Sequence, residues 1–135
     1  MAEVLASLKK IGGNGEQYTE TVLWTNSSPT SSFADQTITL SDSIDNYSSL
    51  GVTFKLSTTE EMSCTIKLSV EDFKKCTNSA TILNPASCAK ISNLAYARRF
   101  YCASDTTIYF AASYRLNTSG TNNAANIPIQ IIGIK

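Results

Sequence analysis

The stretch Met62-Ser-Cys-Thr-Ile-Lys-Leu-Ser-Val70 decides the fold class of this chain. Its apolar residues alternate strictly with polar ones, which is the period of a β-strand with one face buried and the other in water. Residues 52–56 alternate in the same way, and the polar run at 57–61 between the two segments predicts a hairpin loop. The pattern therefore indicates an antiparallel β-protein.

Further short strands are predicted on both sides of this hairpin. We expect them at 21–24, 36–40, 97–102, 106–112 and 127–134. Residues 71–94 are the least regular part, with one helical turn expected at 71–75. Roughly seven or eight short strands with no helices between them predict an all-β fold, an antiparallel β-sandwich of jelly-roll or related type.

The N-terminal residues have a helical period instead. One apolar stripe of a short helix would be formed by Val4, Leu5, Leu8 and Ile11. A helix of about three turns is marginal alone in water, so this stripe should dock either on another chain or on its own sandwich. Because Gly12-Gly13-Asn14-Gly15 would end the helix, we expect an anchoring helix and linker in 1–15 and a β-sandwich domain in 16–135.

Composition and charge exclude several classes of function. The 135 residues fit one domain and include 11 basic and 11 acidic side chains but no histidine. Without histidine the chain lacks the usual general base and the commonest metal ligand, so we expect no catalytic triad, metal site or cofactor. Net neutrality and thinly spread Lys and Arg argue against a nucleic-acid partner.

No stretch has the apolar run of a secretory signal or of a membrane span, so we expect a protein made in the cytoplasm and not inserted in a membrane. The four cysteines are then expected to be thiols, since that compartment is reducing. Cys64 and Cys102 fall in register with apolar neighbours and are predicted to fill the core.

An enzyme built from this inventory would have to rely on carboxylates. Adjacent pairs such as Glu60 and Glu61 lie in a predicted polar loop, where carboxylates are ordinarily solvated. We therefore expect that the protein is not an enzyme. A small hydrolase that uses two carboxylates is the third alternative, after a structural and a carbohydrate-binding function.

The C-terminal strand is apolar on both faces. It is either central and covered on both sides, or one of its faces meets another subunit. Together with the N-terminal stripe it gives the expected partner interface, which consists of Val4, Leu5, Leu8, Ile11, Ile127, Ile129, Ile132 and Ile134.

Four tyrosines form a second candidate surface. They are Tyr96, Tyr101, Tyr109 and Tyr114. Tyr109 alternates with Ile108 and Phe110, so its ring should point away from the core. Exposed tyrosines can stack on sugar rings or anchor a subunit interface, and the interface is favoured because Tyr is enriched there.

Three segments carry a resemblance to a known group of proteins. They are Val4-Leu-Ala-Ser-Leu-Lys-Lys-Ile11 with its glycine linker, the stretch Tyr18-Thr-Glu-Thr-Val-Leu-Trp-Thr-Asn-Ser-Ser-Pro29 continuing to Leu40, and Ile127-Pro-Ile-Gln-Ile-Ile-Gly-Ile-Lys135. Together they resemble small virion proteins of tailed bacteriophages and prophages of Firmicutes, of the tail-fibre, head-fibre or decoration type. The four cysteines depart from that group.

The resemblance implies a non-enzymatic structural protein of the virion. Its expected partners are other virion proteins (capsid, tail or baseplate) through the N-terminal helix, and sibling chains in a homo-oligomer, with a trimer favoured. The alternative is a carbohydrate-binding module that uses the exposed tyrosines to recognise a glycan of the host cell wall.

Overall fold

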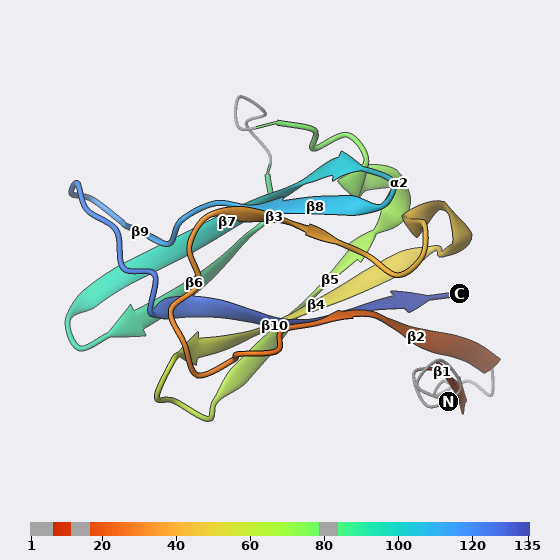
Figure 1. Cartoon of the computed structure of the whole chain (residues 1–135), viewed down its shortest axis with the longest axis horizontal. Coiled ribbons are helices and arrows are strands. Elements are labelled where there is room, and N and C mark those ends of the chain that lie inside the picture. The colour runs from red at the N-terminus through yellow and green to blue at the C-terminus, as the bar shows by residue number, and fades with distance from the viewer. Residues whose placement is uncertain (1–6, 12–16, 79–83) are drawn as a thin grey trace.

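The computed structural model describes residues 7–11, 17–78 and 84–135, and these form two antiparallel β-sheets packed face to face (Figure 1). Sheet A contains, in spatial order, β1 (Ser7–Ile11), β2 (Gln17–Thr25), β10 (Ala125–Ile134), β4 (Ser49–Ser57) and β5 (Ser63–Ser69). Sheet B contains β3 (Gln36–Thr39), β8 (Thr107–Phe110), β7 (Leu94–Ser104) and β6 (Ala86–Ile91), with the short β9 (Tyr114–Arg115) beside β7. The predicted all-β sandwich is thereby confirmed.

Two short helices lie in the connections. They are the 3₁₀-helix η1 (Ile44–Asn46) and the α-helix α2 (Val70–Phe73). The hydroxyl of Ser69 accepts a hydrogen bond from the backbone N–H of Asp72 and so caps α2. The helical turn expected near residues 71–75 is therefore present, one residue earlier along the chain.

The 62–70 alternation forms β5, which pairs with β4 as the predicted hairpin. Thr53 and Thr65 stand opposite each other, and their hydroxyl oxygens are 2.8 Å apart. The expectation that Cys64 fills the core is wrong, because β5 is an edge strand and Cys64 is exposed. Cys102, on β7, is buried as expected.

Aromatic rings fill the space between the two sheets. Neighbouring ring centroids in this cluster lie between 5.4 and 6.2 Å apart. The cluster consists of Trp24, Phe33, Phe54, Phe73, Phe100 and Phe110. Both sheets, α2 and the loop after β2 contribute to it, so the core depends on residues distant in sequence.

Strand β10 lies in the middle of sheet A, between β2 and β4. Ile127 and Ile131 are completely buried. This agrees with the first of the two alternatives for a strand that is apolar on both faces, namely a central position in the sheet. Bulges interrupt both pairings: Leu23 is the extra residue of β2, and Ile129 is the extra residue of β10 against β4. The bulge at Leu23 places it in the core together with Trp24.

Gly133 of β10 is required by close contact with an aromatic ring. A Cβ atom at this position would lie 2.5 Å from Cδ1 of Tyr47, so any larger residue would displace the ring. The hydroxyl of Tyr47 donates a hydrogen bond to Asp42 at 3.0 Å. The Tyr47 ring and Asp42 thus fix the chain before β4 against the end of β10.

The predicted N-terminal helix is not supported. Residues 7–11, which it would include, form strand β1 and pair antiparallel with β2, from Ser7↔Thr21 to Ile11↔Gln17. A short isolated helix gains little, whereas the free edge of β2 offers unpaired N–H and C=O groups to a neighbouring segment. Val4, Leu5 and the glycine linker lie outside the described residues.

The guanidinium group of Arg98 is completely buried between β7 and the segment that leads into β10. Its nitrogens donate hydrogen bonds to the main-chain carbonyls of Asn126 (2.7 Å), Ala111 (2.6 Å), Ala125 (3.2 Å) and Asn123 (3.5 Å). We call these five residues the Arg98 cluster. Burial lowers the pKa of Arg98 to about 10, so the group remains charged at neutral pH.

Asn126 extends the cluster with its side chain. Its amide nitrogen donates to the carbonyl of Tyr96 and to the hydroxyl of Ser113, and its amide oxygen accepts from the hydroxyl of Ser87. The backbone of Asn126 is left-handed, with φ of 52°, a conformation that asparagine tolerates better than most residues. The buried polar groups of β6, β7 and β10 are therefore bonded to one another.

Replacing Arg98 by Met should lower the free energy of unfolding by about 3 kcal/mol or more, because buried main-chain carbonyls would lose their charged donor, although the carbonyl of Asn123 keeps a hydrogen bond from the backbone N–H of Phe33. Urea unfolding of Arg98→Met and of the wild type measures this loss. Arg99→Met is the matched control, since Arg99 is the exposed neighbour and should cost less than about 1 kcal/mol. Equal losses in the two variants would show that the cluster does not hold the fold together.

Candidate functional site: a tyrosine platform and an apolar hollow

The outer face of sheet B carries a pair of stacked tyrosines. Tyr101 of β7 lies directly opposite Tyr109 of β8, with ring centroids 4.9 Å apart and planes inclined by 32°. The chain neighbours of Tyr109, Ile108 and Phe110, are completely buried, so alternation directs its ring outward as predicted. Both tyrosine rings are partly exposed.

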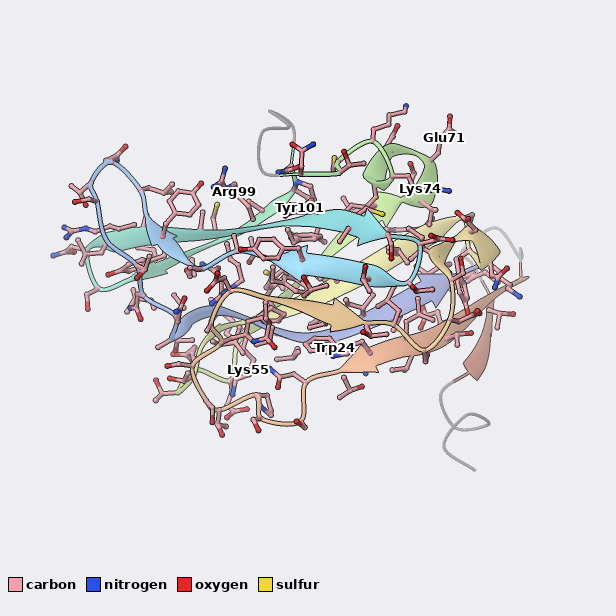
Figure 2. All side chains as sticks on the ribbon, turned by 45° about the horizontal axis from the view of Figure 1, so that its top comes forward. Trp24, Lys55, Glu71, Lys74, Arg99 and Tyr101 are labelled. Atoms are coloured by element: carbon pink, nitrogen blue, oxygen red, sulfur yellow. The ribbon has the colours of Figure 1, made fainter. Side chains whose placement is uncertain are left out.

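Arg99 and Tyr114 continue this surface. Arg99 lies two residues before Tyr101 and projects from the same side of β7 (Figure 2). Its guanidinium carbon is 5.3 Å from the centroid of the Tyr114 ring. We call Arg99, Tyr101, Tyr109 and Tyr114 the tyrosine platform, and it offers flat aromatic surface next to one cation.

Asp35, in the loop before β3, adds a carboxylate at the margin of the platform. It accepts a hydrogen bond of 3.4 Å from the hydroxyl of Tyr109. Partial burial raises the pKa of Tyr109 above its ordinary value, and the negative charge of Asp35 raises it further. The neutral phenol is therefore favoured in the folded protein.

The fourth predicted tyrosine does not belong to this surface. Tyr96 is buried, with 8% of its surface exposed, and its carbonyl accepts the hydrogen bond from Asn126. It lies five residues before Tyr101, an odd separation that places the two rings on opposite faces of β7. The structure thus brings together three of the four predicted tyrosines.

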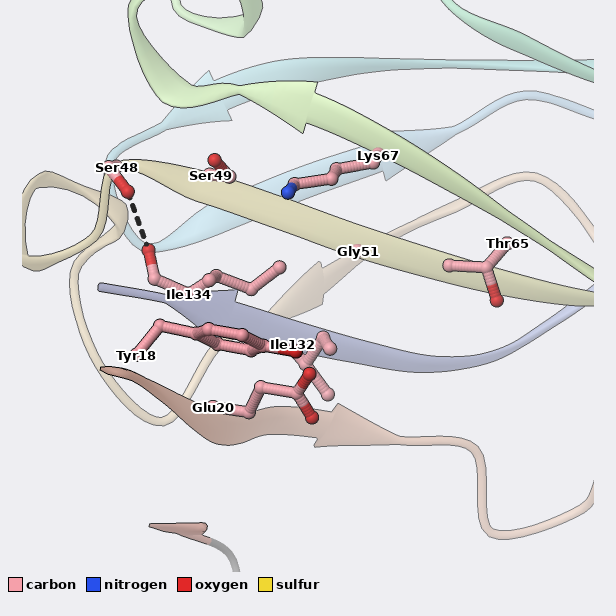
Figure 3. Close-up of a pocket in the computed structure, with 9 residues that line it drawn as sticks. All are labelled: Tyr18, Glu20, Ser48, Ser49, Gly51, Thr65, Lys67, Ile132 and Ile134. Carbon is pink, nitrogen blue, oxygen red and sulfur yellow. Dashed lines mark hydrogen bonds between the residues drawn. The ribbon is translucent and has the colours of Figure 1, made fainter. Parts of the chain in front are cut away.

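The outer face of sheet A has a hollow of about 460 Å³ (Figure 3). Ile132 and Ile134 of β10 form its apolar part together with Tyr18 of β2, and all three are half-buried. Gly51 leaves room for the side chain of Ile132, because a Cβ atom there would lie 2.9 Å from Cγ1 of Ile132. We call this surface the isoleucine hollow.

Charged groups stand on both sides of the isoleucine hollow. Glu20 is on β2 and Lys67 on β5, with the apolar residues of β10 between their strands. The hydroxyl of Ser48 donates a hydrogen bond of 3.0 Å to the carbonyl of Ile134 at one end. An apolar floor with a polar rim is typical of protein interfaces.

The other predicted interface residues lie elsewhere. Ile127 is completely buried and Ile129 packs against the core, so neither is part of the isoleucine hollow. Leu8 and Ile11 lie in strand β1. Of the residues that line the hollow, Ile132 and Ile134 were predicted and the others, such as Tyr18 and Lys67, were not, since the strands had to be paired before their shared face could be known.

Within residues 7–11, 17–78 and 84–135, no group of three or more acidic, cysteine or histidine side chains could hold a metal ion. Glu60 and Glu61 are both exposed, in the loop between β4 and β5. No helix in that part of the chain is long and apolar enough to cross a membrane. Comparison with protein-family models gives no match, and comparison with curated proteins gives none either.

Removing the charge of Asp35 should lower the pKa of Tyr109 toward its ordinary value. The neutral phenol contributes stability that is fully present below pH 10 and is lost as the pH rises through the raised pKa, so Asp35→Asn should reduce this pH dependence. NMR titration of ¹³C-labelled tyrosine in Asp35→Asn measures the shift, with Asp45→Asn as a control that keeps Asp35. An unchanged Tyr109 titration would contradict the contact.

Proposed function

We propose that this protein is a non-enzymatic structural component of a bacteriophage virion, displayed as a fibre or decoration subunit in a homo-oligomer. The resemblance of both chain ends to such proteins supports the assignment. The isoleucine hollow carries the proposal, because a central strand has two half-buried isoleucines on the face away from the core. Such a face gains free energy when a second subunit covers it.

We assign the contact between subunits to the outer face of sheet A and not to the N-terminal helix that the sequence predicted. β1 lies at the edge of this sheet, so residues 7–11 stay close to the contact as a strand. Charges of opposite sign on the two sides of the hollow suit a head-to-tail contact around a closed ring, because Glu20 of one chain can face Lys67 of the next. A trimer is the proposed assembly, and the virion is the proposed location.

The jelly-roll-like description of the sandwich belongs to this proposal as well. The connections β2–β3, β3–β4, β5–β6 and β9–β10 each pass from one sheet to the other, which supports it. Among the described strands, the antiparallel pairs β1–β2, β4–β5, β6–β7 and β7–β8 are consecutive in the chain and stay within one sheet.

Ile132→Asp should convert the oligomer to monomers, because a carboxylate would replace the apolar floor of the contact. Size-exclusion chromatography with light scattering is expected to give the mass of three chains for the wild type and of one for the variant. Met62→Asp is the control: Met62 is 63% exposed and lies in the β4–β5 loop, away from the hollow. A monomeric wild type, or oligomers in both variants, would refute the contact.

A second candidate is recognition of a host cell-wall glycan by the tyrosine platform. The stacked Tyr101 and Tyr109 favour it, since two partly exposed rings 4.9 Å apart offer an extended surface for sugar rings. This function is compatible with the first, because the platform and the isoleucine hollow lie on the outer faces of different sheets.

Tyr101→Ala and Tyr109→Ala should each weaken binding to a purified cell-wall polysaccharide about tenfold, through loss of one stacking surface. Calorimetric titration checks the change, and Tyr101→Phe, which keeps the ring, should bind like the wild type. The glycan function fails if the wild type binds no glycan on an array, or if both alanine variants bind unchanged.

A further inference from the structure

A second hollow lies toward the other end of the outer face of sheet A. It has a volume of about 430 Å³, and its walls come from β2, β4, β10 and the loops beside them. The residues that matter for its chemistry are Thr25, Thr53, Lys55, Glu61, Ile129 and Gln130. We call it the Lys55 hollow.

Lys55 is the unusual residue of this site (Figure 2). Only 7% of its surface is exposed, although lysine is among the residues least often buried. Within the described part of the chain, its ammonium group forms neither a hydrogen bond nor an ion pair. The lysine stem is therefore packed in the protein while the charge at its end lacks a partner.

The ammonium group is open to the hollow and not sealed in the protein. Among described side chains, only the amide oxygen of Asn84 is both shielded from solvent and without a hydrogen-bond partner. The Lys55 nitrogen, which also has no partner, must then contact the space that its side chain lines. A cation held at the wall of a hollow by a buried stem loses less side-chain entropy on binding an anion than a free surface lysine does.

The other walls are polar but almost uncharged. Thr25, Thr53 and Gln130 supply hydroxyl and amide groups that suit the hydroxyls of a sugar, and Ile129 supplies an apolar patch. Glu61 is the one carboxylate among the lining residues, and it is not within ion-pair distance of Lys55.

We propose that the Lys55 hollow binds the carboxylate or phosphate group of a hydroxyl-rich small ligand, such as a sugar acid or a sugar phosphate. The anion would receive hydrogen bonds from the Lys55 ammonium, and the sugar hydroxyls would pair with the threonine and glutamine side chains. The site uses neither the tyrosine platform nor Ile132 and Ile134, so it goes beyond the function proposed above and can fail independently of it.

The experiment is an NMR titration of the lysine side-chain signals with four probes. Galacturonate is compared with galactose, and glucose 1-phosphate with glucose, at constant ionic strength. We expect the Lys55 signals to shift with at least one charged probe and with neither neutral sugar. A response to galacturonate indicates a carboxylate site, and a response to glucose 1-phosphate indicates a phosphate site. Lys55→Met should weaken binding of that probe about tenfold or more.

Two further variants make the result decisive. Lys90→Met removes an exposed lysine of β6 and should leave the affinity unchanged. If Lys55→Met does not fold, Lys55→Arg is the variant to measure. It keeps the charge and should retain binding. The proposal is overturned if no charged probe moves the Lys55 signals, if neutral sugars act equally, or if Glu61→Gln shifts those signals in the free protein as the loss of an ion pair would.

Discussion

The buried guanidinium group of Arg98 is the interaction on which the rest of this structure depends. It donates hydrogen bonds to the carbonyls of residues 111, 123, 125 and 126, which lie directly after β8, shortly before β10 and at the start of β10. Those carbonyls are positioned beneath β7, where water is excluded, and a cation with several donors satisfies them together. The described carboxylates form no ion pair with Arg98, and the charge of Asp35 only partly offsets the burial that lowers its pKa, so the main-chain carbonyls carry most of the compensation for this charge.

The next residue of β7 shows how closely structure and binding surfaces are connected. Arg98 points inward and holds the 111–126 segment, whereas Arg99 points outward and contacts Tyr114, a residue of that same segment. The tyrosine platform is thus built partly on a segment that the Arg98 cluster fixes. On the other sheet, β10 contributes buried isoleucines to the core and half-buried ones to the outer face, so one strand serves both surfaces.

Much of the fold follows from residue patterns, and the exceptions have physical causes. Alternation predicts β4, β5 and β8, since each has clear inner and outer residues, and the run of apolar residues on both faces predicts β10. Strand β6 was missed because its buried positions hold Ser87 and Ala89, which are small and show no apolar alternation. β1 was predicted as helix because its strand state depends on the free edge of β2, a partner that local spacing does not reveal. Lys55 carries no local signal either, because the hollow that it lines is formed by β2, β4, β10 and two loops, which come from distant parts of the sequence.

The central place of β10 also governs the order in which this sandwich can assemble. β2 and β4 are neighbours of β10 and not of each other, so neither gains its inner partner until residues 125–134 have been synthesised. The side chain of Asn26, for example, bonds the carbonyl of Pro128, 102 residues further along the chain. Folding dominated by such distant pairings is slow, and strands that wait for a partner expose apolar faces and unpaired N–H and C=O groups during that time. On the ribosome, sheet A is therefore completed last, and crowded synthesis of many copies favours pairing between chains as well as within them.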